Sequence, residues 1–243
     1  SFKYKKNYFM LVTIIIPCYN EKNTIEQIIN KILNIKGIDK QIILVDDCSN
    51  DGTKEILLNK IESKVDKIIY HDFNKGKGSA IKSSIQFIKG EIVIIQDADL
   101  EYDPSDYINL LKPFINKEVN VVYGSRVLGR LKKEKGFSKN FRIFGNYILT
   151  KFSNKINNQN LTDAHTCYKL FRREIFLKLD FKENDFSFCP EVTTKLSKLN
   201  EKITEVPINY YGREYKEGKK IGYKDAIKAI LVIFKYKFKK FSD

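Results

Sequence analysis

Three carboxylate side chains, Asp97, Asp99 and Glu101, stand at alternate positions directly after an apolar segment of the chain. In extended backbone, alternate side chains face the same way, so we expect these carboxylates on one side. Such hard oxygen ligands suit Mg²⁺ or Mn²⁺, which keep their remaining coordination positions for water and substrate phosphates. The alternative is a solvated acidic loop that leads into the turn at Asp103 and Pro104. The position directly after an apolar segment favours the metal site.

Two more motifs carry polar residues suited to binding a nucleotide. Residues 46–53 (DDCSNDGT) contain Ser49 and Asp51, either of which suits the cap of a following helix. That leaves Asp46 to accept hydrogen bonds from the base or ribose of a ligand. Residues 74–78 (NKGKG) are a glycine-rich loop without the spacing of a P-loop or a dinucleotide fingerprint. Glycines there allow the backbone to approach an anion, although a plain turn would have the same composition.

An alternation of strand and helix patterns positions these motifs. Short apolar runs predict strands at 11–17, 41–45, 67–71 and 91–96, and helical spacing of apolar residues predicts helices at 23–35, 53–63 and 78–88. The apolar runs are continuous, as expected for strands covered on both faces. The order predicts an α/β protein with a doubly wound, mainly parallel sheet. Ligands bind beyond the carboxyl ends of such strands, which is where the polar motifs fall.

Composition is typical of a folded domain. The chain has 243 residues, of which 42% are hydrophobic and 30% charged, so it suits one large α/β domain or two small ones. No apolar segment is long enough to predict a membrane-spanning helix, and no leader typical of a cleaved secretory signal is evident. The cysteines at 18, 48, 167 and 189 have no CxxC spacing, so we expect reduced thiols rather than a zinc site or a disulfide framework.

Charge divides the chain into two halves. Residues 1–125 contain 17 basic and 17 acidic side chains, whereas residues 126–243 contain 27 and 13, so the whole net charge of +14 lies in the second half. A basic half is expected to meet phosphates, a membrane surface or a nucleic acid. It has no RRM or helix-turn-helix signature, and the acidic strand ends would repel a phosphate backbone. Nucleic acid is therefore not the expected partner, and a nucleic-acid-binding protein is only a remote alternative.

Taken together, five segments resemble the successive motifs of the family 2 glycosyltransferases. They are 12–21 (VTIIIPCYNE), 45–53 (VDDCSNDGT), 74–80 (NKGKGSA), 94–104 (IIQDADLEYDP) and 124–126 (GSR). The sequence is most similar to the dolichyl- or polyprenyl-phosphate mannosyltransferase-like branch. Residues 162–174 resemble the segment that closes the active site, and 221–238 resemble the tail of single-domain members. The resemblance implies a GT-A-like domain at 11–212, with a nucleotide-sugar-binding half at 11–125, an acceptor half at 126–212 and a basic tail at 213–243.

The resemblance also implies an activity, inverting transfer of a sugar from a nucleotide-diphosphate sugar such as GDP-mannose or a UDP-hexose, with Mg²⁺ or Mn²⁺. Donor-binding positions by the family's pattern are Pro17, Tyr19, Glu21, Asp46, Lys77, Gly78, Asp97, Ala98 and Asp99. Glutamine is commonest at the position of Glu101, and the extra charge should strengthen metal binding. Side chains that match those facing the diphosphate or the acceptor phosphate are Arg126, Arg142, Arg213 and Lys219. The residues expected to carry catalysis are Asp99, Arg126 and Asp163.

The acceptor decides whether a general base is needed. A phosphate monoester is already an oxyanion at neutral pH, so a polyprenyl phosphate needs positioning rather than deprotonation. A saccharide or other hydroxyl acceptor needs a carboxylate base, for which Asp163 is the first candidate and Glu191 the second. His165 is a further polar candidate at the site. The sequence leaves both acceptor classes open.

The basic tail bears on the choice of acceptor. Lysines alternate there with apolar residues at helical spacing, namely Ile227, Ile230, Leu231, Phe234 and Phe238. This pattern predicts an amphipathic helix that lies on an anionic membrane surface or docks on the protein's own core. An enzyme that uses a lipid phosphate needs such a surface, so we expect a cytoplasmic protein that associates peripherally with a membrane.

Overall fold

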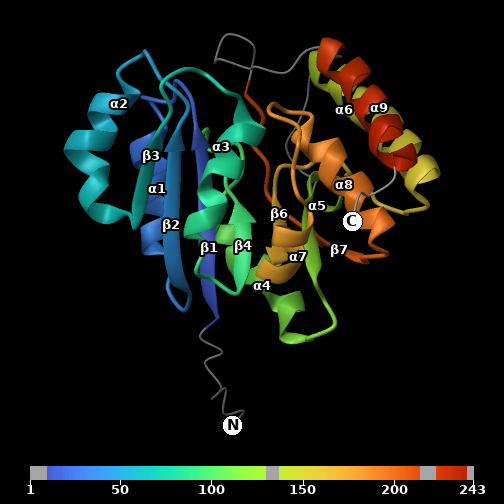
Figure 1. Cartoon of the computed structure of the whole chain (residues 1–243), viewed down its shortest axis with the longest axis horizontal. Coiled ribbons are helices and arrows are strands. Elements are labelled where there is room, and N and C mark those ends of the chain that lie inside the picture. Colours follow the sequence, from blue (N-terminus) through green and yellow to red (C-terminus); the bar gives the residue numbers. More distant parts are fainter. Residues whose placement is uncertain (1–9, 130–136, 214–222, 240–243) are drawn as a thin grey trace.

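The computed structural model describes residues 10–129, 137–213 and 223–239, with the backbone alone at 137–144 and 223–224. One sheet of seven strands, in the order β3-β2-β1-β4-β6-β5-β7, forms the centre of the fold (Figure 1). All neighbouring pairs are parallel except those of β6, which is antiparallel to β4 and β5. The strands are β1 (Leu11–Cys18), β2 (Asp39–Asp46), β3 (Lys67–Tyr70), β4 (Ile92–Ile95), β5 (Val121–Ser125), β6 (Lys169–Arg172) and β7 (Ile203–Pro207).

Helices cover both faces of the sheet, as the continuous apolar strands require. Along β1, Ile14 and Ile16 pack into the core on the side of α1 and α4, while Ile15 packs into the core on the side of α3, α7 and α8. The α-helices are α1 (Ile25–Asn34), α2 (Thr53–Ile56), α3 (Lys77–Ser84), α4 (Tyr107–Leu111), α5 (Arg126–Gly129), α6 (Phe137–Asn157), α7 (Arg173–Lys178), α8 (Phe188–Lys198) and α9 (Tyr223–Phe238). Short π and 3₁₀ turns are η1 (Leu57–Ile61), η2 (Glu62–Lys64), η3 (Ile85–Phe87), η4 (Pro104–Asp106) and η5 (Lys112–Ile115).

The predicted fold is confirmed, with local differences. The doubly wound, mainly parallel sheet is present, and each of the first four predicted strands lies within two residues of an observed one at either end. The helix predicted at 53–63 is instead a short α-helix followed by a π turn and a 3₁₀ turn. The antiparallel strand β6 brings residues 162–168, which precede it, next to the end of β5. Because β6 lies between β4 and β5, residues from the second half of the chain join an edge of the sheet that the first half otherwise forms.

The C-terminal helix α9 packs along α6 and α8 (Figure 1). The ring of Phe234 meets that of Phe152 on α6 edge to face, with 5.5 Å between centroids. Lys235 forms an ion pair of 2.7 Å with Glu183. The side chains that α9 buries are Ala229, Val232, Ile233 and Tyr236, while most of the predicted apolar stripe stays exposed. Among the described residues, no helix combines the length and the apolar character needed to cross a membrane.

Candidate active site

An acidic loop, residues 97–101, follows β4 at the carboxyl end of the parallel strands. We predicted an extended segment with its three carboxylates on one side, and that geometry is wrong. Residues 98–99 form a turn, and Leu100 has a φ of 63°, in the left-handed region. The backbone N–H of Glu101 donates to the Asp99 Oδ1 atom at 3.1 Å, which closes the turn. The three carboxylates therefore do not share one face: Asp97 pairs with Lys77, whereas Asp99 and Glu101 both contact Arg213.

Two positively charged side chains, Lys77 and Arg213, partly neutralise the carboxylates of the acidic loop. Lys77, in the first turn of α3, forms an ion pair with Asp97. Arg213 binds both carboxylate oxygens of Glu21, at 3.0 and 3.1 Å, and also reaches Asp99 at 3.0 Å. Its backbone N–H donates to Glu101 at 2.7 Å. A single guanidinium thus serves acids from two strand ends.

The carboxyl of Asp99 holds its proton more tightly than an ordinary aspartate. Its burial raises the pKa, and the negative charges of Asp97 and Glu101 raise it further, to about 7, against the opposing effect of Arg213. The acidic loop therefore carries more negative charge than its partners in the described part of the chain neutralise. Surplus charge on hard oxygen atoms is the chemistry that a divalent cation satisfies.

Gln96, a buried residue directly before the acidic loop, holds the loop in place through its side-chain amide. The sequence did not reveal this role. The Gln96 side-chain oxygen accepts hydrogen bonds from the hydroxyls of Tyr107 at 2.8 Å and Tyr168 at 2.6 Å. Its side-chain nitrogen donates to the carbonyl oxygens of Asp97, at 2.9 Å, and Tyr102. One amide thereby fixes both ends of the acidic loop. The only sequence signal was a polar residue at the end of an apolar strand.

A second charged unit, which we call the arginine clamp, consists of Arg126 and Asp163. The Arg126 side chain donates to both carboxylate oxygens, from Nε at 2.7 Å and from a terminal nitrogen at 2.8 Å. The Arg126 backbone N–H and the Asn146 amide add bonds of 3.1 Å each. Asp163 is fully buried, yet its contact with Arg126 lowers the pKa of its carboxyl to about 2 against the effect of burial.

The segment that carries Asp163 is anchored by Glu205 on β7, another residue that the sequence did not reveal. Glu205 accepts hydrogen bonds from the backbone N–H groups of Thr162 at 2.8 Å and Asp163 at 3.0 Å. Tyr210 links the clamp to the acidic loop. Its hydroxyl donates to Glu101 at 2.8 Å, and its ring centroid lies 5.2 Å from the Arg126 guanidinium carbon.

Neither candidate base has the form of a general base. Both oxygens of Asp163 are engaged in the arginine clamp, and its low pKa makes it a weak proton acceptor. Glu191 is buried in α8, where it accepts the backbone N–H groups of Lys182 and Glu183 at 2.8 Å each and pairs with Lys195. It thus orients the loop before α8. Burial lowers the pKa of His165 to about 4, and its Nε2 atom has no partner among the described residues.

Two neighbouring aspartates at the end of β2 have different surroundings. Asp46 is buried, which raises the pKa of its carboxyl, and one of its oxygens accepts no hydrogen bond from the described part of the chain. Asp47, which sequence reasoning passed over, accepts His71 Nδ1 at 2.6 Å and the backbone N–H groups of Lys75 and Gly76 at 2.8 and 2.7 Å. Asp47 therefore shapes the glycine-rich loop, and Asp46 keeps an unused acceptor.

The glycine-rich loop packs against the protein itself. Gly76 has a φ of 90°, and a Cβ atom there would lie 2.5 Å from the Asn184 carbonyl oxygen. A Cβ atom on Gly78 would collide with the carbonyl oxygen of Glu183. Close approach of residues 183–184 is thus sufficient to require both glycines. Within this motif, the Lys77 ammonium group reaches the acidic loop.

The remaining predicted residues are distributed as follows. Pro17 and Tyr19 lie at the end of β1, partly exposed, and Ala98 is buried inside the acidic loop. The side chain of Arg142 and the whole of Lys219 fall outside the described residues. The site that the structure brings together therefore contains Glu21, Asp97, Asp99, Glu101 and Arg213, with Lys77 paired to Asp97, and the arginine clamp connected to Glu101 through Tyr210.

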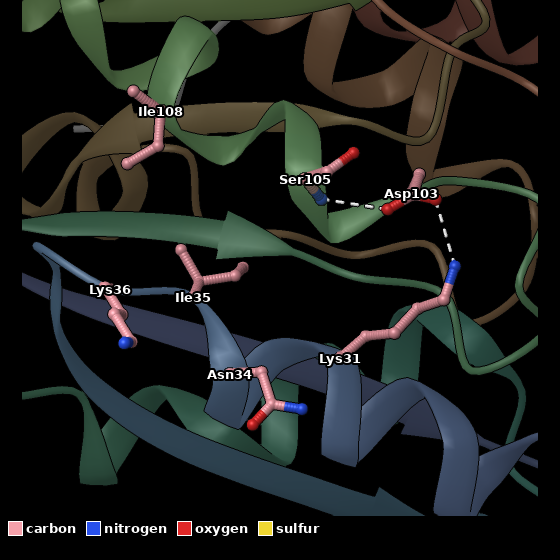
Figure 2. A pocket seen from close by; sticks show the side chains of 7 residues that line it. All are labelled: Lys31, Asn34, Ile35, Lys36, Asp103, Ser105 and Ile108. Carbon is pink, nitrogen blue, oxygen red and sulfur yellow. Dashed lines mark hydrogen bonds and ion pairs between the residues drawn. The ribbon is translucent and has the colours of Figure 1, made fainter.

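A pocket of about 400 Å³ lies between the end of α1 and the residues that begin η4 and α4 (Figure 2). Its edge is the ion pair of Lys31 with Asp103, and Ile35 and Ile108 supply apolar walls. None of the acidic-loop carboxylates lines it, so we do not assign this pocket to the site. In the described parts of the chain, no group of three or more His, Cys, Asp or Glu side chains is arranged to hold a metal.

Comparison with known proteins places this site in a family. Residues 13–180 match the model of glycosyl transferase family 2. Curated relatives include a dolichyl-phosphate beta-glucosyltransferase of Trichomonas vaginalis, 27% identical over 82% of this chain and 65% of that protein. A dolichol-phosphate mannosyltransferase of Pyrococcus furiosus is 28% identical over 86% of this chain and 59% of that protein. The chain thus spans less than two thirds of either relative.

Solved structures share the fold at lower identity. A glucosyl-3-phosphoglycerate synthase of Mycobacterium tuberculosis superposes with a TM-score of 0.72 at 16% identity, covering 96% of this chain and 80% of that one. That structure was determined in complex with Mn²⁺, UDP and phosphoglyceric acid. A mannosyl-3-phosphoglycerate synthase of Rubrobacter xylanophilus gives 0.69 at 17% identity, covering 93% and 72%. With the family model matched over most of the sheet and the acidic loop, this chain belongs to glycosyl transferase family 2.

Proposed function

We propose that this glycosyltransferase moves a hexose, with inversion, from a nucleotide-diphosphate sugar to a polyprenyl phosphate, and that it requires Mg²⁺ or Mn²⁺. One observation carries the choice of acceptor. The carboxylate best suited by sequence to act as a base, Asp163, is buried with both oxygens bound to Arg126. A phosphate acceptor needs no base, because its oxygen is already ionised. Both relatives described above are named for transfer to dolichyl or dolichol phosphate, which supports a lipid phosphate of that type.

The donor side of the proposal uses the acidic loop. Asp97, Asp99 and Glu101 supply hard oxygen atoms with surplus charge, which fits a divalent cation once Lys77 and Arg213 turn from these acids toward the diphosphate. When bound, the cation supplies charge neutralisation at the leaving diphosphate. The two released side chains then bind phosphate oxygens directly. The unused oxygen of Asp46 accepts a hydrogen bond from the base or ribose.

The arginine clamp acts on the acceptor side. Arg126 is held rigidly by two bonds to Asp163, and its face lies near the ring of Tyr210. A guanidinium fixed in this way orients a phosphate without losing side-chain entropy at the moment of binding. Asp163 is thus a positioning residue for Arg126. Its negative charge also keeps the clamp from binding anions as strongly as a lone arginine would.

A membrane surface is the proposed source of the acceptor. Exposed apolar side chains gather on α6 and α9, which lie side by side, and comprise Tyr147, Ile148, Ile227, Leu231, Phe234 and Phe238. Lys228 and Lys235 lie on the same helix α9, each paired with an acid in the loop before α8. Apolar side chains flanked by lysines suit peripheral binding to the cytoplasmic face of an anionic membrane.

The first experiment is a donor screen by thermal shift. GDP-mannose, UDP-glucose, UDP-GlcNAc and their nucleoside diphosphates are each added with Mn²⁺ or with EDTA. We expect one base to raise the melting temperature in the presence of Mn²⁺ only, because bound ligand stabilises the folded state. Asp99→Ala should remove the shift, while Asp103→Asn, just outside the acidic loop, should keep it. Equal shifts with EDTA would contradict the metal requirement.

The second experiment separates the two acceptor classes. A short polyprenyl phosphate is compared with the polyprenol of the same chain length, which differs only in presenting a hydroxyl. We expect transfer to the phosphate and none to the alcohol. Transfer to the alcohol would support the hydroxyl alternative and require a base that the geometry of Asp163 and Glu191 does not supply.

A further inference from the structure

His71, one of the two histidines of the chain, is buried directly after β3, and neither side of the proposed function uses it. Its backbone N–H donates to the Asp46 carbonyl oxygen at 2.9 Å, next to the last pair of β2 with β3. Its Nδ1 atom lies 2.6 Å from Asp47 Oδ1, and its Nε2 atom lies 2.8 Å from the Ser83 hydroxyl oxygen. Both ring nitrogens are bound, so the imidazole is fixed in orientation as well as in place.

The Asp47 carboxylate connects this imidazole to the glycine-rich loop. Asp47 Oδ1 also accepts the backbone N–H of Lys75 at 2.8 Å. Asp47 Oδ2 accepts the backbone N–H of Gly76 at 2.7 Å. A carboxylate only accepts hydrogen bonds, so the hydrogen of its bond with His71 belongs to Nδ1. Because Gly76 directly precedes α3, the carboxylate fixes the backbone where that helix begins.

The helix that begins there carries a charged residue of the site. Lys77 is the first residue of α3, and its ammonium group forms an ion pair with Asp97. Ser83 lies near the other end of α3, and its hydroxyl donates to the Ser79 carbonyl oxygen at 3.1 Å. The imidazole of His71 therefore contacts the end of α3 directly and, through the carboxylate of Asp47, the backbone at its start.

We propose that His71 is a positioning residue for the donor, because through Asp47 it holds the backbone from which Lys77 reaches the diphosphate. The identity of the ligand in this inference rests on the proposed function. A lysine side chain has many rotamers, and a fixed backbone at its base reduces the disorder that binding must remove. The Nδ1 bond to Asp47 carries this role, whereas the Nε2 contact with Ser83 stabilises α3 itself.

Two substitutions separate the two ring nitrogens. His71→Asn keeps a nitrogen donor at the position of Nδ1 and loses the contact with Ser83. His71→Gln keeps a nitrogen at the position of Nε2 and loses the bond to Asp47. Isothermal titration calorimetry measures the dissociation constants of GDP and of UDP with Mn²⁺ for the wild type and both variants.

We expect His71→Gln to bind the preferred nucleoside diphosphate about ten-fold more weakly, the scale that a hydrogen bond to a charged group contributes. His71→Asn should stay within about two-fold of the wild type, because its donor to Asp47 remains. Ser83→Ala is the matched control and should lower the melting temperature without a change in affinity. Equal weakening by Asn and Gln would mean that the imidazole only fills space, and wild-type affinity in His71→Gln would equally refute the proposal.

A double-mutant cycle tests the route through Lys77. If His71 acts by placing that ammonium group, His71→Gln should change the affinity of Lys77→Ala by less than about two-fold, because the interaction it supports is already absent. The same loss in both backgrounds would show that His71 affects the donor independently of Lys77, which contradicts the proposed role.

Amide hydrogen exchange, followed by NMR without any ligand, tests the positioning itself. We expect the Lys75 and Gly76 amides to exchange about ten-fold faster in His71→Gln than in the wild type, and at the wild-type rate in His71→Asn. Unchanged protection in His71→Gln would overturn the proposal. If that variant does not fold, Asp47→Asn, which keeps one acceptor oxygen, takes its place with the same expectation. If the wild type binds neither GDP nor UDP, the proposed function fails, and the exchange rates still decide whether His71 holds the loop.

Discussion

The acidic loop and the arginine clamp each place an aspartate against an arginine, but the two aspartates have opposite properties. The pKa of Asp99 is raised to about 7, and that of Asp163 is lowered to about 2. Burial raises both, so the difference comes from the partners. Asp163 receives two guanidinium bonds and a backbone N–H from Arg126. Asp99 receives one bond from Arg213, which is also bound to Glu21.

The two units differ in charge balance: the arginine clamp is neutral within itself, whereas the acidic loop carries excess negative charge. The arginine clamp balances its own charges within a buried ion pair, so its stability requires nothing from outside. The acidic loop concentrates Asp97, Asp99 and Glu101 around less positive charge than they carry, counted over the residues that the structure describes. Burial of like charges is unfavourable unless a cation or protons neutralise them. We therefore propose that the clamp contributes rigidity and that the loop binds a cation.

The largest expected effect comes from breaking the clamp. Arg126→Ala leaves the Asp163 carboxylate buried without its partner, which costs about 3–5 kcal/mol of unfolding free energy. Urea denaturation measures this loss, and transfer activity should fall below detection. The matched control is the double change of Arg126→Ala with Asp163→Ala, which leaves no buried charge and should recover part of the stability but none of the activity. A single variant as stable as the wild type would mean that the clamp is not rigid.

The acidic loop should respond in the opposite way. Asp99→Asn should reduce transfer by about 10³-fold, because the loop loses charge needed for the cation. Its stability should not fall. The folded-state pKa of Asp99 lies above its ordinary value, so the stability that this carboxyl contributes is full below about pH 4 and is lost as the pH rises through about 7.

An asparagine removes that loss, and we expect the variant to be about 1–2 kcal/mol more stable than the wild type near pH 8. Thermal denaturation at two pH values measures the difference. Asp103→Asn is the control, since Asp103 caps η4 and pairs with Lys31 outside the loop. Equal stability of wild type and Asp99→Asn at both pH values would contradict the raised pKa.

A smaller effect is expected in the pH dependence of Mn²⁺ affinity, which reports the protonation of Asp99. Binding of Mn²⁺ needs the ionised Asp99, so the affinity should rise up to about ten-fold per pH unit below about pH 7 and level off above it. Electron paramagnetic resonance of free Mn²⁺ measures the affinity without any turnover. In Asp99→Asn the affinity should be lower and nearly independent of pH over this range. A parallel pH dependence in the variant would assign the titration to another group.

Much of this fold could be predicted because its strands and helices follow from local patterns of apolar residues. The continuous apolar runs that became β1 and β4 gave the parallel sheet and placed Asp97 and Asp99 at its edge. The antiparallel strand β6 could not be predicted in the same way, because its pairing with β4 and β5 depends on contacts across the chain. A short strand of this kind has no periodicity of its own.

In the candidate site, too, residues with a local sequence signal could be predicted, and residues defined by distant contacts could not. Asp46 was found because it follows a predicted strand, and Arg126 because its segment resembles a motif of the family. Their supports were missed, among them Gln96, Asp47 and Glu205, because a polar side chain that bonds to distant backbone leaves no local signal. The turn at Leu100 was missed for a related reason, since the left-handed backbone there is not suggested by its residue type.

The smallest expected effect belongs to Tyr210, the side chain that touches both units. Its hydroxyl donates to Glu101 at 2.8 Å, and its ring faces Arg126 at 5.2 Å. Tyr210→Phe removes only the hydrogen bond and should cost about 1 kcal/mol of stability while it weakens Mn²⁺ binding. Tyr210→Leu also removes the aromatic ring, so it should add a further loss of about 0.5–1 kcal/mol that appears in acceptor KM rather than in Mn²⁺ affinity. If both variants change the same parameter, the loop and the clamp act as one unit; separate effects would show that Tyr210 joins two units with distinct tasks.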